Sequence, residues 1–180
     1  MPRQLQLVRP GVGPPHRERP VRPGCVYAVR PPATPLLANA LGRVDWSDAF
    51  AVDLATAEDG RDPQGWADAI FRAPRPPAAR ILFGARELMV RAVGIERGGP
   101  HVFDTVSRSG HEVLLGTDQK HLAFRASVLV DRNRVVLSTV VELRNRRGRA
   151  YFALVRRLHP FVVRAALARA ARTSGDRDQG

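Results

Sequence analysis

The sequence contains one cysteine, Cys25, and one lysine, Lys120, among its 180 residues. A single cysteine excludes an intramolecular disulfide framework and a cysteine metal cluster, so a reducing compartment is the expected setting. No stretch of about 18 apolar residues is present, and the N-terminus lacks the continuous apolar segment of a secretory signal. We therefore expect a cytoplasmic protein without a transmembrane segment.

The motifs of common catalytic and cofactor sites are also missing. The five histidines show neither HxxxH nor HExxH spacing, GxSxG does not occur, and residues 94–99 form no GxGxxG or Walker pattern. We predict no metal site, no cofactor and no catalytic residue. The sequence leaves open whether the protein is an enzyme.

The net charge of +12 is concentrated at the two ends of the chain. Residues 1–30 contain six arginines and one glutamate, and residues 144–180 contain ten arginines and two aspartates, whereas residues 31–143 carry a charge of −1. A neutral body does not provide the basic surface of a nucleic-acid-binding domain. We do not expect nucleic acid as a partner.

Length and composition predict one domain between two tails. Residues 1–35 are rich in proline and arginine, which favours a disordered tail, and residues 173–180 form a polar tail that is also predicted to be disordered. The single domain is expected to span residues 36–172.

The centre of this domain is predicted to be a long hairpin within residues 118–143. Apolar residues alternate with others in both strands, and Arg132-Asn133 would form the turn, with Asn133 suited to a positive φ. A one-residue slip would send each apolar set to the wrong face, so the pattern selects one register. This register opposes Phe124 to Val141, Ala126 to Thr139, Val128 to Leu137 and Asp131 to Arg134. It also places Arg125 diagonal to Glu142, which predicts a cross-strand charge pair.

The other predicted elements surround this hairpin. They are a strand over residues 45–54, a helix that starts at Pro63 after the cap residue Asp62, a helix over 78–94, and short strands over 102–107 and 112–116. The last is a long helix over 147–171, in which Pro160 predicts a kink near residues 156–159. This order predicts an α+β fold in which a curved antiparallel sheet wraps the C-terminal helix.

Four stretches carry a family resemblance: DWSDAF at 45–50, DPQGWA at 62–67, LGTDQKHLAFR at 115–125 and RNRRGRAY at 144–151. They resemble a bacterial family known as domain of unknown function 2867, in which an acidic residue often stands where this chain has Ala123. The order of elements is similar to the helix-grip fold of the START-like, polyketide-cyclase (SRPBCC) superfamily. The resemblance implies a cavity between the sheet and the long helix, and it implies no particular reaction.

The leading functional hypothesis is the binding of an apolar small molecule between the hairpin and the last helix. Ala126 and Thr139 are small and opposed, which would leave room for a ligand, and Thr139 is the only hydroxyl on that hairpin face. The predicted lining residues are Phe124, Ala126, Val128, Leu137, Thr139, Val141, Tyr151, Leu154 and Leu158.

Asp118, His121 and Arg125 are the candidates for polar contacts. His121 and Arg125 share a strand face, but about 13 Å separates their Cα atoms, so they form no dyad by themselves. The favoured interpretation is structural, with Arg125 paired to Glu142 and His121 near Arg144 or the Asp118 turn. In the alternative, they hold an anionic ligand at the mouth of a pocket.

Two further functions remain open. One is a cyclase or hydratase that uses His121 or Asp118 as general base, although the strand parity of His121 points it away from the predicted cavity. The other is a protein-interaction module that acts through the arginine-rich ends. The arginines of residues 144–149 are expected to be solvated, and contact with phosphate or a membrane surface is the alternative interpretation.

Overall fold

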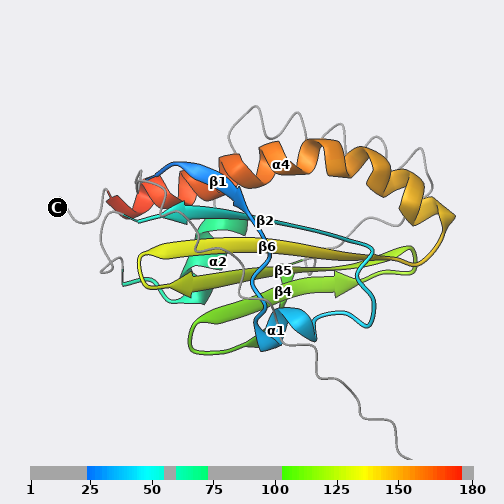
Figure 1. Cartoon of the computed structure of the whole chain (residues 1–180), viewed down its shortest axis with the longest axis horizontal. Coiled ribbons are helices and arrows are strands. Elements are labelled where there is room, and N and C mark those ends of the chain that lie inside the picture. The colour runs from blue at the N-terminus through cyan, green and yellow to red at the C-terminus, as the bar shows by residue number, and fades with distance from the viewer. Residues whose placement is uncertain (1–23, 55–59, 73–102, 176–180) are drawn as a thin grey trace, which may run out of the picture.

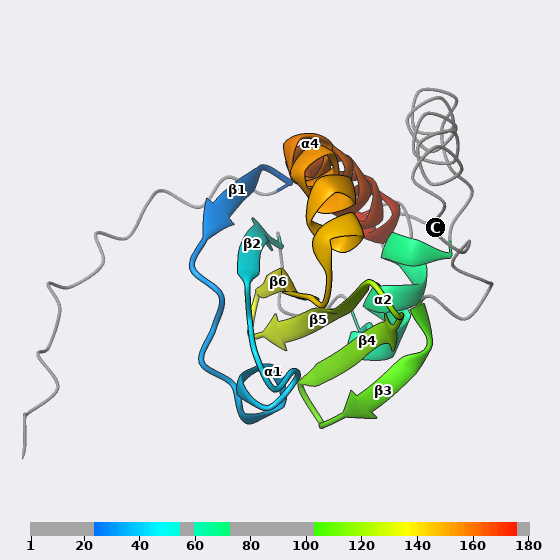
Figure 2. The same ribbon diagram turned by 90° about the vertical axis from the view of Figure 1, so that its right-hand side faces the viewer.

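The computed structural model describes residues 24–54, 60–72 and 103–175. Within them, six strands form one antiparallel sheet in the order β1-β2-β6-β5-β4-β3. The strands are β1 (Val26–Val29), β2 (Trp46–Asp53), β3 (Thr105–Arg108), β4 (Glu112–Asp118), β5 (Leu122–Asp131) and β6 (Arg134–Leu143), and the helices are α1 (Pro35–Ala38), α2 (Pro63–Phe71) and α4 (Arg146–Gly175). Figures 1 and 2 show a curved sheet with α4 lying along one face. The predicted α+β class, with a curved sheet and a long C-terminal helix, is confirmed.

The register of the central hairpin is the predicted one. Ala126 lies opposite Thr139, and the other three predicted pairs also occur. The turn differs in one respect, because the positive φ of 52° belongs to Arg132 and not to Asn133. The alternation of apolar residues therefore predicted the register correctly, whereas the identity of the turn residues did not predict which of them has the positive φ.

The main hydrophobic core lies between the sheet and the two longer helices. Val163 and Leu167 of α4 belong to the same buried cluster as Trp66 and Ile70 of α2 and Val128 of β5. Asp62 caps α2 as predicted, with its carboxylate accepting a hydrogen bond of 2.7 Å from the Gly65 amide. At the other end of α2, Arg169 donates to the Ile70 carbonyl at 2.9 Å, so a side chain of α4 satisfies a helix C-terminus.

The N-terminal prediction requires a correction, because β1 and the cap of α1 fall within the segment predicted to be disordered. The hydroxyl of Tyr27 on β1 donates to Asp53 at 2.8 Å, and Arg134 donates to the same carboxylate oxygen at 2.9 Å. Burial, followed by the hydrogen bond to Asp53, raises the pKa of Tyr27. The proline content masked a four-residue edge strand, since prolines flank the VYAV sequence without interrupting it.

The face of the sheet opposite α4 is also covered. Leu37 of α1 is buried against Leu114 and Val140. The Thr34 hydroxyl accepts from the Leu37 amide and donates to Glu112 at 2.9 Å, and Glu112 also accepts from Ser127. The chain from β1 to α1 therefore runs from one edge of the sheet, where β1 lies, to β4 (Figure 2).

Helix α4 is longer than predicted and continues through Pro160 to Gly175, so the predicted C-terminal tail begins later than residue 173. The predicted helix over 78–94, residues 1–23 of the predicted tail and residues 176–180 lie outside the described residues. None of the described helices is long and apolar enough to cross a membrane.

Candidate functional site

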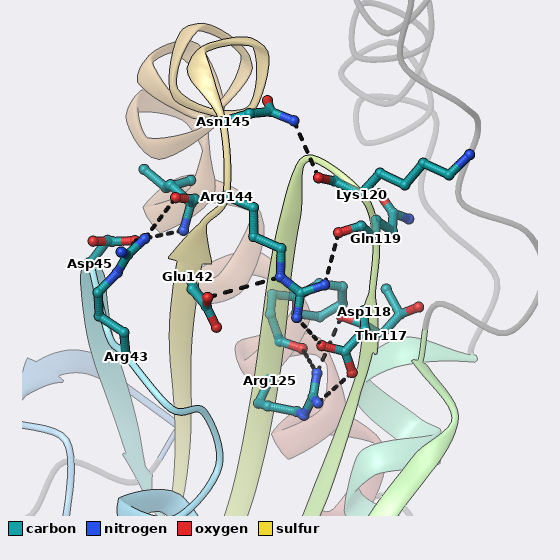
Figure 3. A network of polar contacts seen from close by, with 12 residues as sticks. Arg43, Asp45, Thr117, Asp118, Gln119, Lys120, Arg125, Glu142, Arg144 and Asn145 are labelled. Carbon is teal, nitrogen blue, oxygen red and sulfur yellow. Dashed lines mark hydrogen bonds and ion pairs between the residues drawn. The ribbon is translucent and has the colours of Figure 1, made fainter.

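A network of polar side chains connects the β4–β5 turn to the start of α4 (Figure 3). Asp118 lies at its centre. One carboxylate oxygen accepts from Arg125 at 2.6 Å, and the other accepts from Arg144 at 2.7 Å. Arg125 is buried and also donates to the carbonyls of Thr117 and Phe124 at 3.2 and 2.9 Å. We call Asp118, Arg125 and Arg144 the Asp118 network.

The network and its neighbours fix the position at which α4 begins. Arg144 donates to the Gln119 carbonyl at 3.1 Å, and its backbone amide donates to the His121 carbonyl at 3.0 Å. The side chain of Asn145 caps the helix, because its oxygen accepts a hydrogen bond of 2.9 Å from the Gly148 backbone amide. Its side-chain nitrogen donates to the Lys120 carbonyl at 3.2 Å. The turn and the helix start are therefore joined by both side-chain and backbone contacts.

Electrostatics make Asp118 a poor general base. Burial raises its pKa, but hydrogen bonds and charges from Arg125 and Arg144 outweigh that effect, and the net pKa lies below the usual value for aspartate. A carboxylate with a lowered pKa holds a proton weakly at neutral pH. Both of its oxygens are already engaged by arginines, and Arg125 in turn is neutralised by Asp118. These contacts favour a structural role for Asp118 and Arg125 over a role in binding an anionic ligand.

One predicted contact of this region differs in the structure, whereas His121 does lie near Arg144, whose backbone amide donates to its carbonyl. Arg125 pairs with Asp118 and not with Glu142, whose carboxylate lies 3.9 Å from Arg144. Asp118 on β4 and Glu142 on β6 are both diagonal to Arg125 on the same sheet face, so each neighbouring strand offers it a carboxylate, and strand parity alone did not select Asp118. His121 is buried with its ring 6.1 Å from that of Tyr151 on α4. It precedes β5, so strand parity does not determine its direction.

The predicted lining residues lie in different environments. Val128 and Leu137 pack into the core cluster with Leu167, and protein side chains fill the space around them. A second cluster joins Tyr151 to Leu122, with Phe124 packed against it. Leu158 is half-buried, whereas Leu154 is 36% exposed on the outside of α4 and cannot line an enclosed site. The buried members are Ala126, Val128, Leu137, Thr139, Val141 and Tyr151.

A carboxylate and an imidazole meet beneath α4, next to the predicted polar residue. Asp48 of β2 pairs with Thr139 of β6, which pairs with Ala126 of β5, so the three side chains form a row on one sheet face. From α4, His159 places Nε2 at 3.2 Å from Oδ1 of Asp48. We call Asp48, Thr139 and His159 the Asp48 site.

The surroundings of the Asp48 site are largely apolar and aromatic. The Trp46 ring lies edge-on to those of Phe152 and His159, with centroid distances of 5.0 and 5.2 Å. Oδ2 of Asp48 is buried and has no hydrogen-bond partner in the described part of the chain. A buried carboxylate oxygen without a donor is costly, so this atom is suited to accept a hydrogen bond from a bound molecule.

Sequence reasoning missed Asp48 and His159 as site residues. The signal for Asp48 was present, because it occupies an even position in a strand whose other even positions, Trp46, Phe50 and Val52, are apolar. An acidic residue on a buried strand face is unusual and marks a position with a specific partner. His159 gave no signal of its own, since its pairing with Asp48 spans 111 residues of sequence.

The described residues contain no metal site, because no three His, Cys, Asp or Glu side chains come together there.

Comparison with curated proteins and with solved structures gave no match. A family model does match residues 40–166, which is more than half of the chain, and its description is "Protein of unknown function (DUF2867)". The matched range includes both the Asp118 network and the Asp48 site. Because the match covers more than half of the chain, the chain belongs to the DUF2867 family.

Proposed function

We propose that the protein binds an apolar small molecule between the sheet and α4, with the polar end of the molecule at the Asp48 site. The observation that carries this proposal is the buried Oδ2 atom of Asp48, which lacks a hydrogen-bond partner on an otherwise apolar sheet face. A ligand with one hydroxyl or amino group would supply the missing donor. Such a donor to a charged acceptor contributes about 1.5–3 kcal/mol.

The side chains around Asp48 support an apolar remainder of the ligand. Thr139 and Ala126 are the small members of the row across β6 and β5, and both belong to buried positions. Trp46 and Phe152 provide aromatic surface beside them. Ligand sites of this kind combine a mostly apolar wall with a few convergent polar groups.

The proposal extends to the fold class. A long C-terminal helix that packs against the face of a curved antiparallel sheet is the arrangement expected of the helix-grip fold. We therefore assign the chain to the START-like superfamily as part of this proposal. The assignment is consistent with ligand binding between helix and sheet, which is the place where the Asp48 site lies.

Native mass spectrometry of the protein purified from its own host tests whether a ligand is carried. A reproducible added mass is expected in the natural protein and is expected to disappear in Thr139→Trp, which fills the row beside Asp48. Ser138→Ala is the matched control, because Ser138 neighbours Thr139 on β6 but faces the other side of the sheet, where its hydroxyl has no partner among the described residues. This control should retain the added mass.

Tryptophan fluorescence tests the role of Asp48, since Trp46 lies beside the site. We expect long-chain alcohols to bind at least about tenfold more tightly than their methyl ethers, which lack the donor. Asp48→Leu should remove this preference. A bare protein that binds neither class, or an Asp48→Leu variant that retains the full preference, would contradict the proposal.

The contact between Asp48 and His159 favours a second candidate function, an enzyme of the cyclase or hydratase type. A carboxylate hydrogen-bonded to an imidazole orients the ring and determines which ring nitrogen carries the proton, as acid–base catalysis requires. His159, and not His121 or Asp118, would then transfer the proton. His159→Gln would separate the two functions, because a binding protein would still bind its ligand, whereas an enzyme would bind it without conversion.

A further inference from the structure

The side of α4 that faces away from the sheet carries an unusual set of residues. The helix has 30 residues and no acidic side chain. Its arginines are Arg146, Arg147, Arg149, Arg156, Arg157, Arg164, Arg169 and Arg172. All but Arg169 are exposed. Because acidic residues are absent, the helix provides no neutralising carboxylate within its own sequence, and its outer surface is strongly cationic.

Two large apolar side chains project from the same surface. Phe161 is 69% exposed and Leu154 is 36% exposed. They are seven residues apart, which places them on one helix face about 10 Å from each other. The buried face is on the opposite side and contains Val163, Leu167 and Ala170. Leu154 and Phe161 are therefore not part of the core.

Arginines extend this pair in both directions along the helix. Arg147 lies seven residues before Leu154, Arg157 lies between the two apolar residues, and Arg172 lies eleven residues after Phe161. A period of seven or eleven residues keeps side chains on one face of an α-helix. We call these five residues the α4 ridge, and it extends for about 38 Å. Figures 1 and 2 show that α4 forms an outer layer over the sheet.

We propose that the α4 ridge is a peripheral docking surface for an anionic lipid bilayer. Arginines along a helix attract acidic headgroups, while projecting Phe and Leu side chains enter the boundary between headgroups and acyl chains. The ridge combines both features on a convex, exposed helix. This surface is separate from the Asp48 site, which lies on the other side of α4.

The apolar pair favours a membrane over nucleic acid. Binding to nucleic-acid phosphates requires arginines but gives no role to an exposed leucine. Single-stranded nucleic acids stack on several aromatic side chains, and Phe161 is the one aromatic residue of the ridge. A bilayer uses both Leu154 and Phe161, because each transfers apolar surface out of water.

Co-sedimentation of the full chain with vesicles tests this proposal. We expect binding to vesicles of phosphatidylcholine mixed with phosphatidylglycerol, and much weaker binding to phosphatidylcholine alone. Each arginine near an anionic surface contributes about fivefold to the partition coefficient, so Arg157→Gln should lower it by about that factor. Phe161→Ser should lower it several-fold at unchanged net charge. High salt should weaken binding of the natural chain.

Arg132→Gln is the matched control, because it removes an equal charge from the exposed β5–β6 turn, which is not part of the ridge. It should change vesicle binding far less than Arg157→Gln. Circular dichroism checks that each variant is folded, which is expected since every altered side chain is exposed. Equal losses for Arg132→Gln and Arg157→Gln, no effect of Phe161→Ser, or binding to single-stranded RNA without binding to anionic vesicles would each overturn the proposal.

Discussion

At the scale of single residues, Asp118 has two arginine partners that differ in burial. The Arg125 side chain is 10% exposed and that of Arg144 is 37% exposed. Asp118→Asn leaves a buried guanidinium without its counter-charge, so we expect it to lower the free energy of unfolding by about 1–3 kcal/mol. Arg144→Gln removes a more solvated pair and should cost less than about 1 kcal/mol. Urea unfolding measures the loss of stability in both variants. A larger loss in Arg144→Gln than in Asp118→Asn would show that the buried pair of Asp118 and Arg125 is not the main stabilising contact.

The lowered pKa of Asp118 gives this interaction a defined pH dependence. An unfolded aspartate titrates near pH 4, so the stabilisation is complete above that pH and is lost as the pH falls through the lower pKa of the folded state. The difference in unfolding midpoint between the natural chain and Asp118→Asn should therefore be constant near neutral pH and shrink in acid. A difference that stays constant down to pH values below the folded pKa would argue against charge pairing.

Single residues also show where sequence reasoning reaches its limit. Alternation placed Thr139 on the α4 side correctly, because strand parity is a local property. The same rule did not apply to His121, which lies outside the regular strand, and Arg125 found a partner in the neighbouring strand β4. Asp48 and His159 meet only after α4 folds back on β2. Their contact depends on tertiary packing that no local pattern encodes.

At the scale of elements, the start of α4 depends on the small size of Gly148. A Cβ atom at this position would lie 2.1 Å from the His121 carbonyl oxygen. Glycine to alanine within a helix usually stabilises a protein by about 0.5–1 kcal/mol. Here we expect the opposite sign, because the helix start or the β4–β5 turn must shift, and we expect a loss of about 1–3 kcal/mol.

Gly110→Ala is the control for this substitution, since a Cβ atom there meets nothing within 4 Å. It should change the unfolding midpoint little, whereas Gly148→Ala should lower it clearly. Thermal unfolding followed by circular dichroism measures both. If Gly148→Ala were as stable as the natural chain, the close approach of α4 to the His121 carbonyl would be refuted.

Elements differed in how far the sequence predicted them. The β5–β6 hairpin and the cap of α2 were predicted correctly, because a two-residue alternation and an Asp-Pro start are strong local signals. Strand β1 was not predicted, since four residues between prolines carry little periodicity. Its place at the sheet edge depends on pairing with β2 and on the contact of Tyr27 with Asp53.

At the scale of the whole molecule, the sheet has two covered faces. Helices α2 and α4 cover one, and the segment from β1 to α1 covers part of the other through Leu37 and Thr34. Glu112 is 3% exposed on this second face and accepts hydrogen bonds from Thr34 and Ser127. The sequence suggested a one-sided core, because the proline-rich N-terminal segment was not predicted to join the domain.

This arrangement predicts that a chain beginning at residue 40, where the family match starts, is less stable than a chain beginning at residue 24. The shorter chain loses the buried Leu37 side chain and leaves Glu112 without the Thr34 donor. The burial of a leucine and a lost hydrogen bond to a buried carboxylate together amount to about 3 kcal/mol or more. Urea unfolding of both chains measures the difference, and binding of a hydrophobic dye should increase in the shorter one as Leu114 and Val140 become exposed.

Thr34→Val in the longer chain isolates the Glu112 contact and should account for a minor part of the loss. Equal stability of the two chains would mean that β1 and α1 do not contribute to the folded domain.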